Sequence, residues 1–315
     1  MKLLVAIPCY NESSEIRNVL TKVRLDINDF PNALILVVDD GSTDDTATVA
    51  EQNCDVVIRH RSNRGLGNAF QTAVDYAISN RFDAMLTIDG DGQFDSRDIK
   101  KLVDPILDGT ADMTTGSRFS AGGFGNGISR TKLIGNKILA KWISWLTHIQ
   151  LKDVSCGFRC YSYNALLRLR RAPSFTYTQS TLLDMATHNV RIVQVPITAE
   201  YFPGRKSRVA ANVFKYAFRT LRIIISSYRE LNPLGFFRTL SIVSAVPAVI
   251  FSAIFLIHYL VTGLFRGFLF AGILGGFFWL ITLTYAIVAR ISHSLRQMKL
   301  VQDEIHFELR KRVSE

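Results

Sequence analysis

Residues 85–93 read MLTIDGDGQ, a largely apolar run that ends in two aspartates separated by one glycine. The run Met85–Ile88 does not alternate between apolar and polar residues, as expected for a strand covered on both faces. In extended chain, residues two apart point the same way and lie ~6.5 Å from one another. Asp89, Asp91 and Gln93 can then converge on one hard divalent cation, which prefers oxygen ligands and can hold a diphosphate.

Four more apolar runs of this kind lie in the first 200 residues, with amphipathic stretches between them. The expected strands are Leu3–Ile7, Leu34–Val38, Val56–Ile58 and Met113–Thr115. The expected helices are Glu15–Leu25, Asp44–Gln52, Gly67–Ile78 and Arg97–Leu107. Strands that alternate with helices predict an α/β fold with a mainly parallel, doubly wound sheet.

Two other predicted strands also end in polar, turn-forming residues. IPCYNE at residues 7–12 ends the first strand, and VDDGSTD at residues 38–44 ends the second. Open α/β sheets bind ligands at the carboxyl ends of their strands, so these turns and the Asp89 turn are expected to border one crevice. A dinucleotide-binding sheet would carry Gly-x-Gly-x-x-Gly after its first strand, and Pro8-Cys9-Tyr10 stands there instead.

The C-terminal third differs from the rest in charge and hydropathy. The chain has 315 residues and a net charge of +10, and residues 201–315 hold 15 Lys and Arg against 5 Asp and Glu. Leu240–Thr262 and Phe268–Ala289 contain no Lys, Arg, Asp or Glu, and each reaches the roughly 20 residues of a membrane helix. They are predicted to form a transmembrane hairpin. Because the basic residues flank apolar runs, the expected partner is a membrane and not a nucleic acid.

The charges beside the hairpin predict its orientation and the organisation of the chain. Basic residues precede the first span and follow the second, at Arg238, Arg290, Arg296 and Lys299, whereas the connector Gly263–Gly267 carries only Arg266. The positive-inside rule then places both ends of the hairpin in the cytoplasm. Asn212–Arg229 has one basic and one apolar side at helical spacing, which predicts a helix in the headgroup plane. The expected parts are a catalytic domain over residues 1–211, the interfacial helix over 212–232, the hairpin over 233–290 and a cytoplasmic tail over 291–315.

Taken together, the motifs resemble those of family-2 glycosyltransferases of the GT-A fold, and within them the polyprenyl-phosphate sugar transferases, the group of dolichyl-phosphate mannose synthase. The similarity covers nearly the whole chain, with its signals at Pro8–Glu12, Asp39–Thr43, Asp89–Gln93, Gly116–Arg118 and Ser155–Arg159. The resemblance implies an enzyme that transfers a hexose-type sugar, with inversion, from a UDP- or GDP-linked nucleotide sugar to a polyprenyl phosphate, undecaprenyl or dolichyl, at the cytoplasmic membrane face. It implies Mg²⁺ or Mn²⁺ as the cofactor, and it leaves the sugar and the formation of a homo-oligomer open.

The resemblance also implies roles for individual residues. The residues implied to bind the nucleotide sugar are Pro8, Tyr10, Glu12, Asp39, Asp89 and Gly90, and those implied to bind the metal are Asp89, Asp91 and Gln93. The implied catalytic residues are Asp91, Arg118 and Arg130. The implied contacts of the acceptor phosphate are Arg118, Arg130, Arg205, Lys206, Ser207 and Arg208, the last four in a basic stretch shifted by one residue from the family pattern.

Three alternatives stay open on the sequence. A processive polysaccharide synthase of the same fold would need more spans and usually a Gln-x-x-Arg-Trp motif, which this sequence lacks. A transferase acting on a non-phosphate glycolipid would need a general base, for which Asp153 and Asp184 are candidates. A non-catalytic membrane protein could use a nucleotide-binding domain only to dock partners, although Asp89, Asp91 and Arg118 together argue against it.

Overall fold

The computed structural model describes residues 1–119, 130–169, 177–188, 190–200 and 228–314, with residues 218, 221, 222, 225 and 226. Contacts divide the chain into two units, Met1–Leu221 with Phe307–Glu315, and Arg222–His306. The first unit contains a seven-stranded sheet with the strand order β3-β2-β1-β4-β6-β5-β7. Its strands are β1 (Lys2–Cys9), β2 (Asn32–Asp39), β3 (Val56–Arg59), β4 (Ala84–Thr87), β5 (Met113–Ser117), β6 (Arg159–Ser162) and β7 (Ile192–Pro196).

All described pairings in this sheet are parallel except those of β6, which runs antiparallel to β4 and β5. The five strands expected from the sequence are β1 to β5, and the predicted α/β class is confirmed. The sequence pattern did not predict β6 and β7. Neither is a long apolar run, since β6 is RCYS and β7 is IVQVP.

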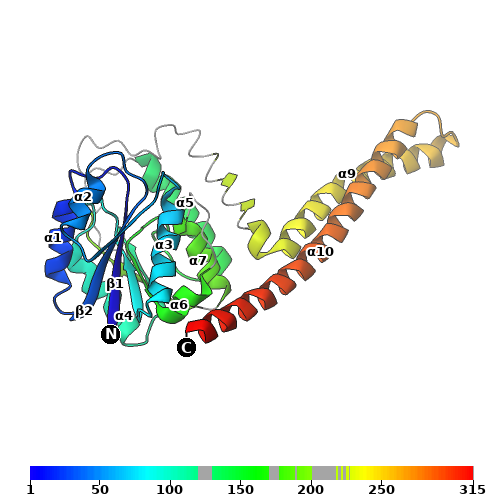
Figure 1. Ribbon diagram of the computed structural model, residues 1–315. Coiled ribbons are helices and arrows are strands. Elements are labelled where there is room, and N and C mark those ends of the chain that lie inside the picture. Colours follow the sequence, from blue (N-terminus) through cyan, green and yellow to red (C-terminus); the bar gives the residue numbers. More distant parts are fainter. Residues whose placement is uncertain are drawn as a thin grey trace. The chain divides into compact units, whose positions relative to one another are not determined.

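Helices cover both faces of the sheet. Those of the first unit are α1 (Ile16–Asp26), α2 (Thr46–Glu51), α3 (Leu66–Ser79), α4 (Ile99–Leu107), α5 (Arg130–Thr147), α6 (Tyr163–Arg168) and α7 (Tyr177–Thr187). Alternate residues of β1, from Leu3 to Ile7, share one buried core with the apolar sides of α1 and α4. Figure 1 shows α1 and α3 on opposite sides of the strands. The buried strands therefore read as continuous apolar runs because both faces meet a helix.

The second unit contains a hairpin of two long helices, α9 (Pro233–Thr262) and the greater part of α10 (Leu269–Ser314). Polar side chains join the two helices, because Ser244 Oγ lies 2.9 Å from Thr282 Oγ1 and Trp279 Nε1 donates to Ser252 Oγ at 3.2 Å. Gly275 lets the helices approach, since an added Cβ would lie 2.8 Å from Ser252 Oγ. Such contacts through small and polar residues are typical of helices that pack in lipid.

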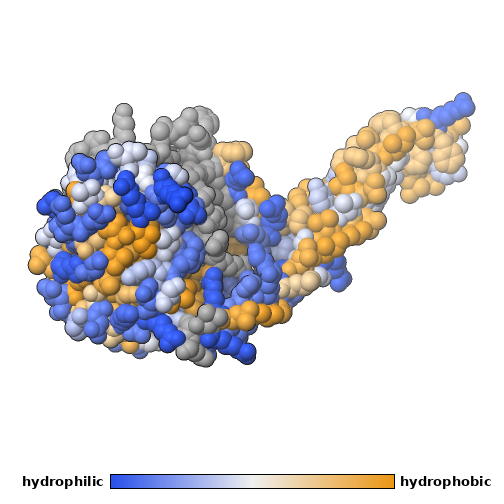
Figure 2. All heavy atoms as spheres, viewed as in Figure 1, coloured by the Kyte–Doolittle hydropathy of each residue, from blue (hydrophilic) through white to orange (hydrophobic). Residues whose placement is uncertain are grey.

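Both hairpin helices are long and apolar enough to cross a membrane, and only 11% of the apolar window of each is buried. A core helix of a water-soluble domain would instead be mostly buried. Figure 2 shows apolar residues along most of both helices. The helix α10 continues without a break beyond Ala289, where the predicted second span ends. The predicted domain boundaries stay predictions, and most of the predicted interfacial helix lies outside the described residues.

Candidate active site

Four strands bring residues of the predicted site to one edge of the sheet. Tyr10 follows β1, Asp39 ends β2, Asp89 comes two residues after β4, and Arg118 follows β5. β1 is parallel to β2 and β4, and β6 is antiparallel to both β4 and β5, so these four strands share one direction. Their carboxyl ends therefore lie at the same edge. Five other residues predicted for the site lie in or next to these ends, and they are Pro8, Glu12, Gly90, Asp91 and Gln93.

The turns after β1 and β2 are joined by hydrogen bonds from short polar side chains. The Asn11 amide donates to Ser42 Oγ and the Glu12 amide donates to Thr46 Oγ1, each at 2.9 Å. The Thr43 amide donates to Asn11 Oδ1 at 2.9 Å. The two turns thus form one rigid wall beside Asp89, a position suited to holding the nucleoside part of a donor.

Asp39 and Asp40 differ in what they bind within this wall. Asp39 is fully buried, its Oδ1 accepts hydrogen bonds from the amide and hydroxyl of Ser42, and its Oδ2 lies 3.2 Å from Arg59 Nε. The carboxylate of the neighbouring Asp40 accepts hydrogen bonds from the backbone amides of Arg64 and Gly65 at 2.9 and 2.7 Å. Asp40 therefore fixes the glycine-rich turn before α3, a role that the sequence did not predict. The role of Asp39 toward a nucleoside stays a prediction.

Asp89, Asp91 and Gln93 lie in an acidic turn after β4, with Gly92 at a φ of 73°, and not in the extended chain that the sequence predicted. All three residues are partly buried, and the Gln93 backbone amide donates to Asp91 Oδ1 at 3.1 Å. Removal from water, and after it the charge of Asp91, raises the pKa of Asp89 to about 7. A bound cation would stabilise the ionised form of Asp89, because it offsets the repulsion between the carboxylates of Asp89 and Asp91.

The donor set in this turn fits a divalent ion that is shared with a substrate. Two carboxylates and one amide are hard oxygen ligands of the kind that Mg²⁺ and Mn²⁺ take. Among the described residues, no group of three or more His, Cys, Asp and Glu could hold a metal ion alone. Phosphate oxygens of a bound diphosphate would complete such a coordination shell.

Arg118 is fixed by a buried ion pair on the other side of the site. Its Nε donates to Asp153 Oδ2 at 2.6 Å, and its Nη2 donates to Asp153 Oδ1 at 2.9 Å. Nη2 also donates to Ser155 Oγ at 2.8 Å. Asp153 is fully buried, so this two-point contact is the charge compensation that a carboxylate requires there. The sequence predicted Arg118 for the site, but it did not predict Asp153 as its partner.

The remaining predicted site residues are only partly described. Arg130 is the first residue of α5. The basic stretch at residues 205–208 lies outside the described residues. Asp184, a candidate base, lies on α7, where its Oδ1 is 3.8 Å from His188 Nδ1. Nothing in these positions tests the predicted roles.

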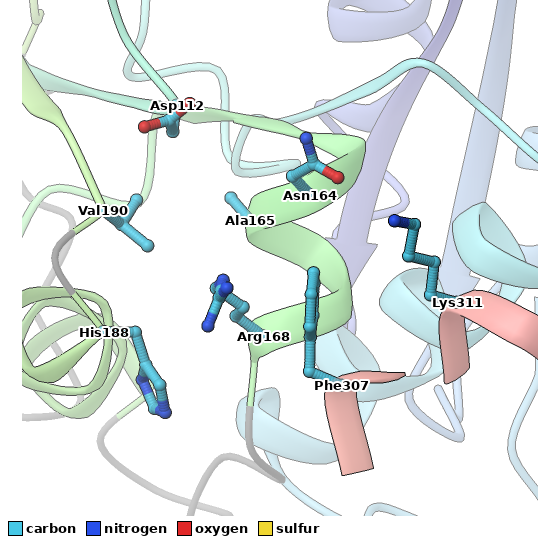
Figure 3. A pocket seen from close by; sticks show the side chains of 8 residues that line it. All are labelled: Asp112, Asn164, Ala165, Arg168, His188, Val190, Phe307 and Lys311. Carbon is cyan, nitrogen blue, oxygen red and sulfur yellow. The ribbon is translucent and has the colours of Figure 1, made fainter. Parts of the chain in front are cut away.

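A cavity of about 360 Å³ lies at the opposite edge of the sheet. Asp112, which precedes β5, and Val190, which precedes β7, line it. Figure 3 shows Arg168 directed into the space between these residues and Phe307, and His188 also lines the cavity. Because β5 runs from this cavity toward Arg118, the cavity is separate from the predicted site.

The seven-stranded α/β sheet, with acidic turns at its strand ends and a fixed arginine beside them, is a GT-A-like fold. The profile of the glycosyl transferase family 2 matches residues 4–169, more than half of the chain. The chain belongs to this family and is a glycosyltransferase, as the sequence motifs predicted.

Several relatives carry names that mention a lipid phosphate. The UDP-N-acetylglucosamine–dolichyl-phosphate N-acetylglucosaminyltransferase of Methanococcus voltae is 28% identical over 70% of this chain and 95% of its own. The polyprenol monophosphomannose synthase of Mycolicibacterium smegmatis is 27% identical over 62% of this chain and 77% of its own. These similarities support the predicted polyprenyl-phosphate sugar transferase group.

A solved structure shows the same fold. Glucosyl-3-phosphoglycerate synthase from Mycobacterium tuberculosis, crystallised with Mn²⁺, UDP and glucosyl-3-phosphoglycerate, matches 73% of this chain and 79% of its own with a TM-score of 0.55. The sequence identity is 20%, so this likeness concerns the fold alone.

Proposed function

We propose that this enzyme transfers a hexose-type sugar, with inversion, from a UDP- or GDP-linked donor to a polyprenyl phosphate at the cytoplasmic face of a membrane. One observation carries the proposal. Arg118, a fixed guanidinium, stands at the same sheet edge as the acidic pair Asp89 and Asp91. The names of the relatives, which mention dolichyl phosphate and polyprenol, support the choice of acceptor.

On the donor side, Asp89, Asp91 and Gln93 would hold Mg²⁺ or Mn²⁺ together with the diphosphate. When bound, such an ion neutralises charge on the leaving diphosphate. The turns of Tyr10, Glu12 and Asp39 would orient the nucleoside, because hydrogen bonds already fix their backbone. The chain then contributes mainly orientation and electrostatic complementarity.

On the acceptor side, the chemistry needs no strong general base. A phosphate monoester has a second pKa of ~6 and is already anionic at neutral pH. Arg118 would reduce the repulsion between the two phosphorylated reactants. Further predicted contacts of the acceptor phosphate are Arg130 and residues 205–208. Asp153, a candidate base, has both oxygens occupied by Arg118. This arrangement favours a single displacement by the phosphate itself, which inverts the anomeric centre.

The exposed side of α5 supports catalysis at a membrane surface. Ile134, Ile138 and Trp145 lie on one side of this helix and are each more than half exposed, at 57%, 55% and 58%. Lys141 lies on the same side at helical spacing, and the sequence of α5 contains no Asp or Glu. Exposed apolar side chains with Trp and Lys are typical of helices at a lipid interface. The sequence pattern did not single out this helix.

A donor screen tests the proposed reaction. Membranes containing the protein would be given UDP- and GDP-linked sugars with undecaprenyl phosphate, and the anomeric configuration of the product would be read by NMR. We expect one donor to yield a β-linked lipid phosphate sugar from an α-linked donor. Equal transfer to the free polyprenol would contradict the proposal, and Asp153 and Asp184 would then become candidate bases.

Labelling of introduced cysteines tests the membrane face. Leu264→Cys, in the connector, is expected to react with an impermeant maleimide from outside, and Gln302→Cys only after the membrane is opened. Background from the four native cysteines is expected to be slow, because burial raises the pKa of the thiols of Cys9, Cys54, Cys156 and Cys160. Labelling of the connector from the cytoplasmic side would refute the proposed orientation.

A further inference from the structure

The segment before β6 lies between the two halves of the proposed site. β6 stands between β4 and β5 in the sheet and is antiparallel to both. Its first residue, Arg159, therefore lies at the edge where β4 and β5 end. Residues 153–157, which lead into β6, thus come between the end of β4, with Asp89, and the end of β5, with Arg118.

One end of this segment fixes Arg118. Asp153 accepts hydrogen bonds from both Nε and Nη2 of the guanidinium, and Ser155 Oγ accepts a hydrogen bond from Nη2 as well. Ser155 Oγ in turn donates to Oδ1 of the buried Asn136 on α5 at 3.1 Å, and Asn136 Nδ2 donates to the Lys152 carbonyl at 3.1 Å. The arginine is therefore positioned by the segment and by α5 together.

The other end of the segment lies against Asp89. A Cβ added to Gly157 would lie 2.8 and 2.9 Å from the two carboxylate oxygens of Asp89 and 3.1 Å from Tyr177 Oη. The carboxylate thus occupies the space that any side chain at this position would fill. The Gly157 carbonyl is itself fixed, because Thr87 Oγ1 on β4 donates to it at 2.7 Å.

We propose that residues 153–157 form a common positioning segment, which sets the distance between the acceptor-side arginine and the metal-side carboxylate. Asp153 and Gly157 are positioning residues in this view, each acting through the residue it contacts. The inference rests on the proposed function for its acceptor half, whereas its metal half concerns Asp89 alone.

The test compares Asp153→Asn and Gly157→Ala in the full-length protein. Asp153→Asn should raise the KM for undecaprenyl phosphate at least about tenfold, because a neutral amide cannot replace the ion pair, and it should leave Mn²⁺ and UDP binding unchanged. Gly157→Ala should weaken Mn²⁺ binding about tenfold, read by electron paramagnetic resonance with UDP and no acceptor, and leave the acceptor KM within about twofold.

Two matched controls lie elsewhere in the chain. Asp112 precedes β5 and accepts hydrogen bonds from Nε and Nη2 of Arg191 at 3.0 and 2.9 Å, the same two-point geometry in a more exposed pair at the opposite edge of the sheet. Gly276 has no atom within 4 Å of an added Cβ. Asp112→Asn and Gly276→Ala should leave both readouts unchanged. If Asp153→Asn folds poorly, Ser155→Ala replaces it, and if Gly157→Ala folds poorly, Thr87→Val replaces it. Each replacement should change the same readout by a smaller factor.

The outcomes separate the inference from the proposed function. If each variant impairs both the acceptor KM and Mn²⁺ binding while its thermal midpoint is unchanged, the two ends of the segment 153–157 do not act separately. That result would overturn the inference. Wild-type Mn²⁺ affinity in both Gly157→Ala and Thr87→Val would overturn the metal half. If the wild type transfers no sugar to any polyprenyl phosphate, the proposed function fails, and the Mn²⁺ titration still decides whether Gly157 positions Asp89.

Discussion

The two halves of the sheet hold their functional residues in different ways. In the half proposed to bind the donor, here called the donor half and made of β3, β2, β1 and β4, neutral side chains such as Ser42 and Thr46 form single hydrogen bonds between neighbouring segments. In the half proposed to bind the acceptor, here called the acceptor half and made of β6, β5 and β7, a buried ion pair joins Arg118 to Asp153, 35 residues further along the chain. The fully buried Arg159 adds a second guanidinium, whose Nη1 donates to Thr181 Oγ1 at 2.7 Å.

This difference has an energetic consequence. A neutral hydrogen bond contributes about 0.5–1.5 kcal/mol, whereas the loss of one partner from a buried ion pair leaves a charge without compensation and costs about 3–5 kcal/mol. The donor half should therefore tolerate changes of these neutral side chains, whereas its acidic turn and the buried Asp39, which pairs with Arg59, should be sensitive. The acceptor half should be sensitive in its supporting residues as well.

The largest effect is expected at Asp91. Asp91→Asn removes a carboxylate from the proposed metal turn and should lower transfer on the order of a thousandfold or more, since a catalytic ion contributes several kcal/mol. The protein should still fold and insert, because Asp91 lies in a partly exposed turn. The measurement is transfer in membranes, with insertion checked by detergent extraction. Full activity in this variant, or in excess EDTA, would contradict the metal assignment.

The acceptor half is tested by Arg118→Lys. An ammonium cannot reproduce the two-point contact with Asp153 that positions the charge of Arg118. Transfer should fall ten- to a hundredfold, in line with ~1.5–3 kcal/mol for a charge-assisted contact. Donor binding, measured by calorimetry, should stay within a few-fold of wild type. A parallel loss of donor binding would show that the two halves are not separate.

The donor half could be predicted from the sequence because its determinants are local. The strands β1, β2 and β4 are continuous apolar runs, and their polar turns follow directly in the chain. The acceptor half depends on β6, whose four residues RCYS include the buried Arg159 and show no strand pattern. The Asp153 pair and the contact of Gly157 with Asp89 arise only when β6 inserts between β4 and β5. No spacing within one segment encodes them.

The pH dependence of Mn²⁺ affinity should also distinguish the two halves. Its expected size is smaller than the effect of Asp91→Asn and larger than that of Arg310→Ala. The pKa of Asp89 is raised to about 7, so below pH 7 a proton competes with the metal. Mn²⁺ affinity, measured with UDP present, should be about tenfold weaker at pH 6 than at pH 8. In the metal-free protein the same shift lowers stability as pH rises from about 4 to about 7, because the folded state binds the proton more tightly. Arg118 keeps its charge throughout this range.

The smallest expected effect concerns the last turns of the chain, which belong to the first unit. Arg310 Nη1 donates to the carbonyls of Leu167 and Leu169 at 3.2 and 2.9 Å, at the C-terminal end of α6. The guanidinium carbon Cζ of Arg168 lies over the ring of Phe307, 4.0 Å from the ring centre. A cation at the carbonyl end of a helix is favoured by the helix dipole and by direct hydrogen bonds.

Arg310→Ala should therefore lower the stability of the catalytic unit without changing its chemistry. Partial exposure of Arg310 limits the loss to about 1 kcal/mol, or roughly 2–4 °C in thermal midpoint for a domain of this size. Arg312→Ala, an exposed arginine two residues further on, should leave the midpoint unchanged. The measurement is thermal unfolding of the full-length protein in detergent, with kcat determined below the transition. Equal midpoints for the two variants would show that Arg310 does not stabilise α6. A fall in kcat for Arg310→Ala alone would show that α6 supports the acceptor half, because α6 directly follows β6.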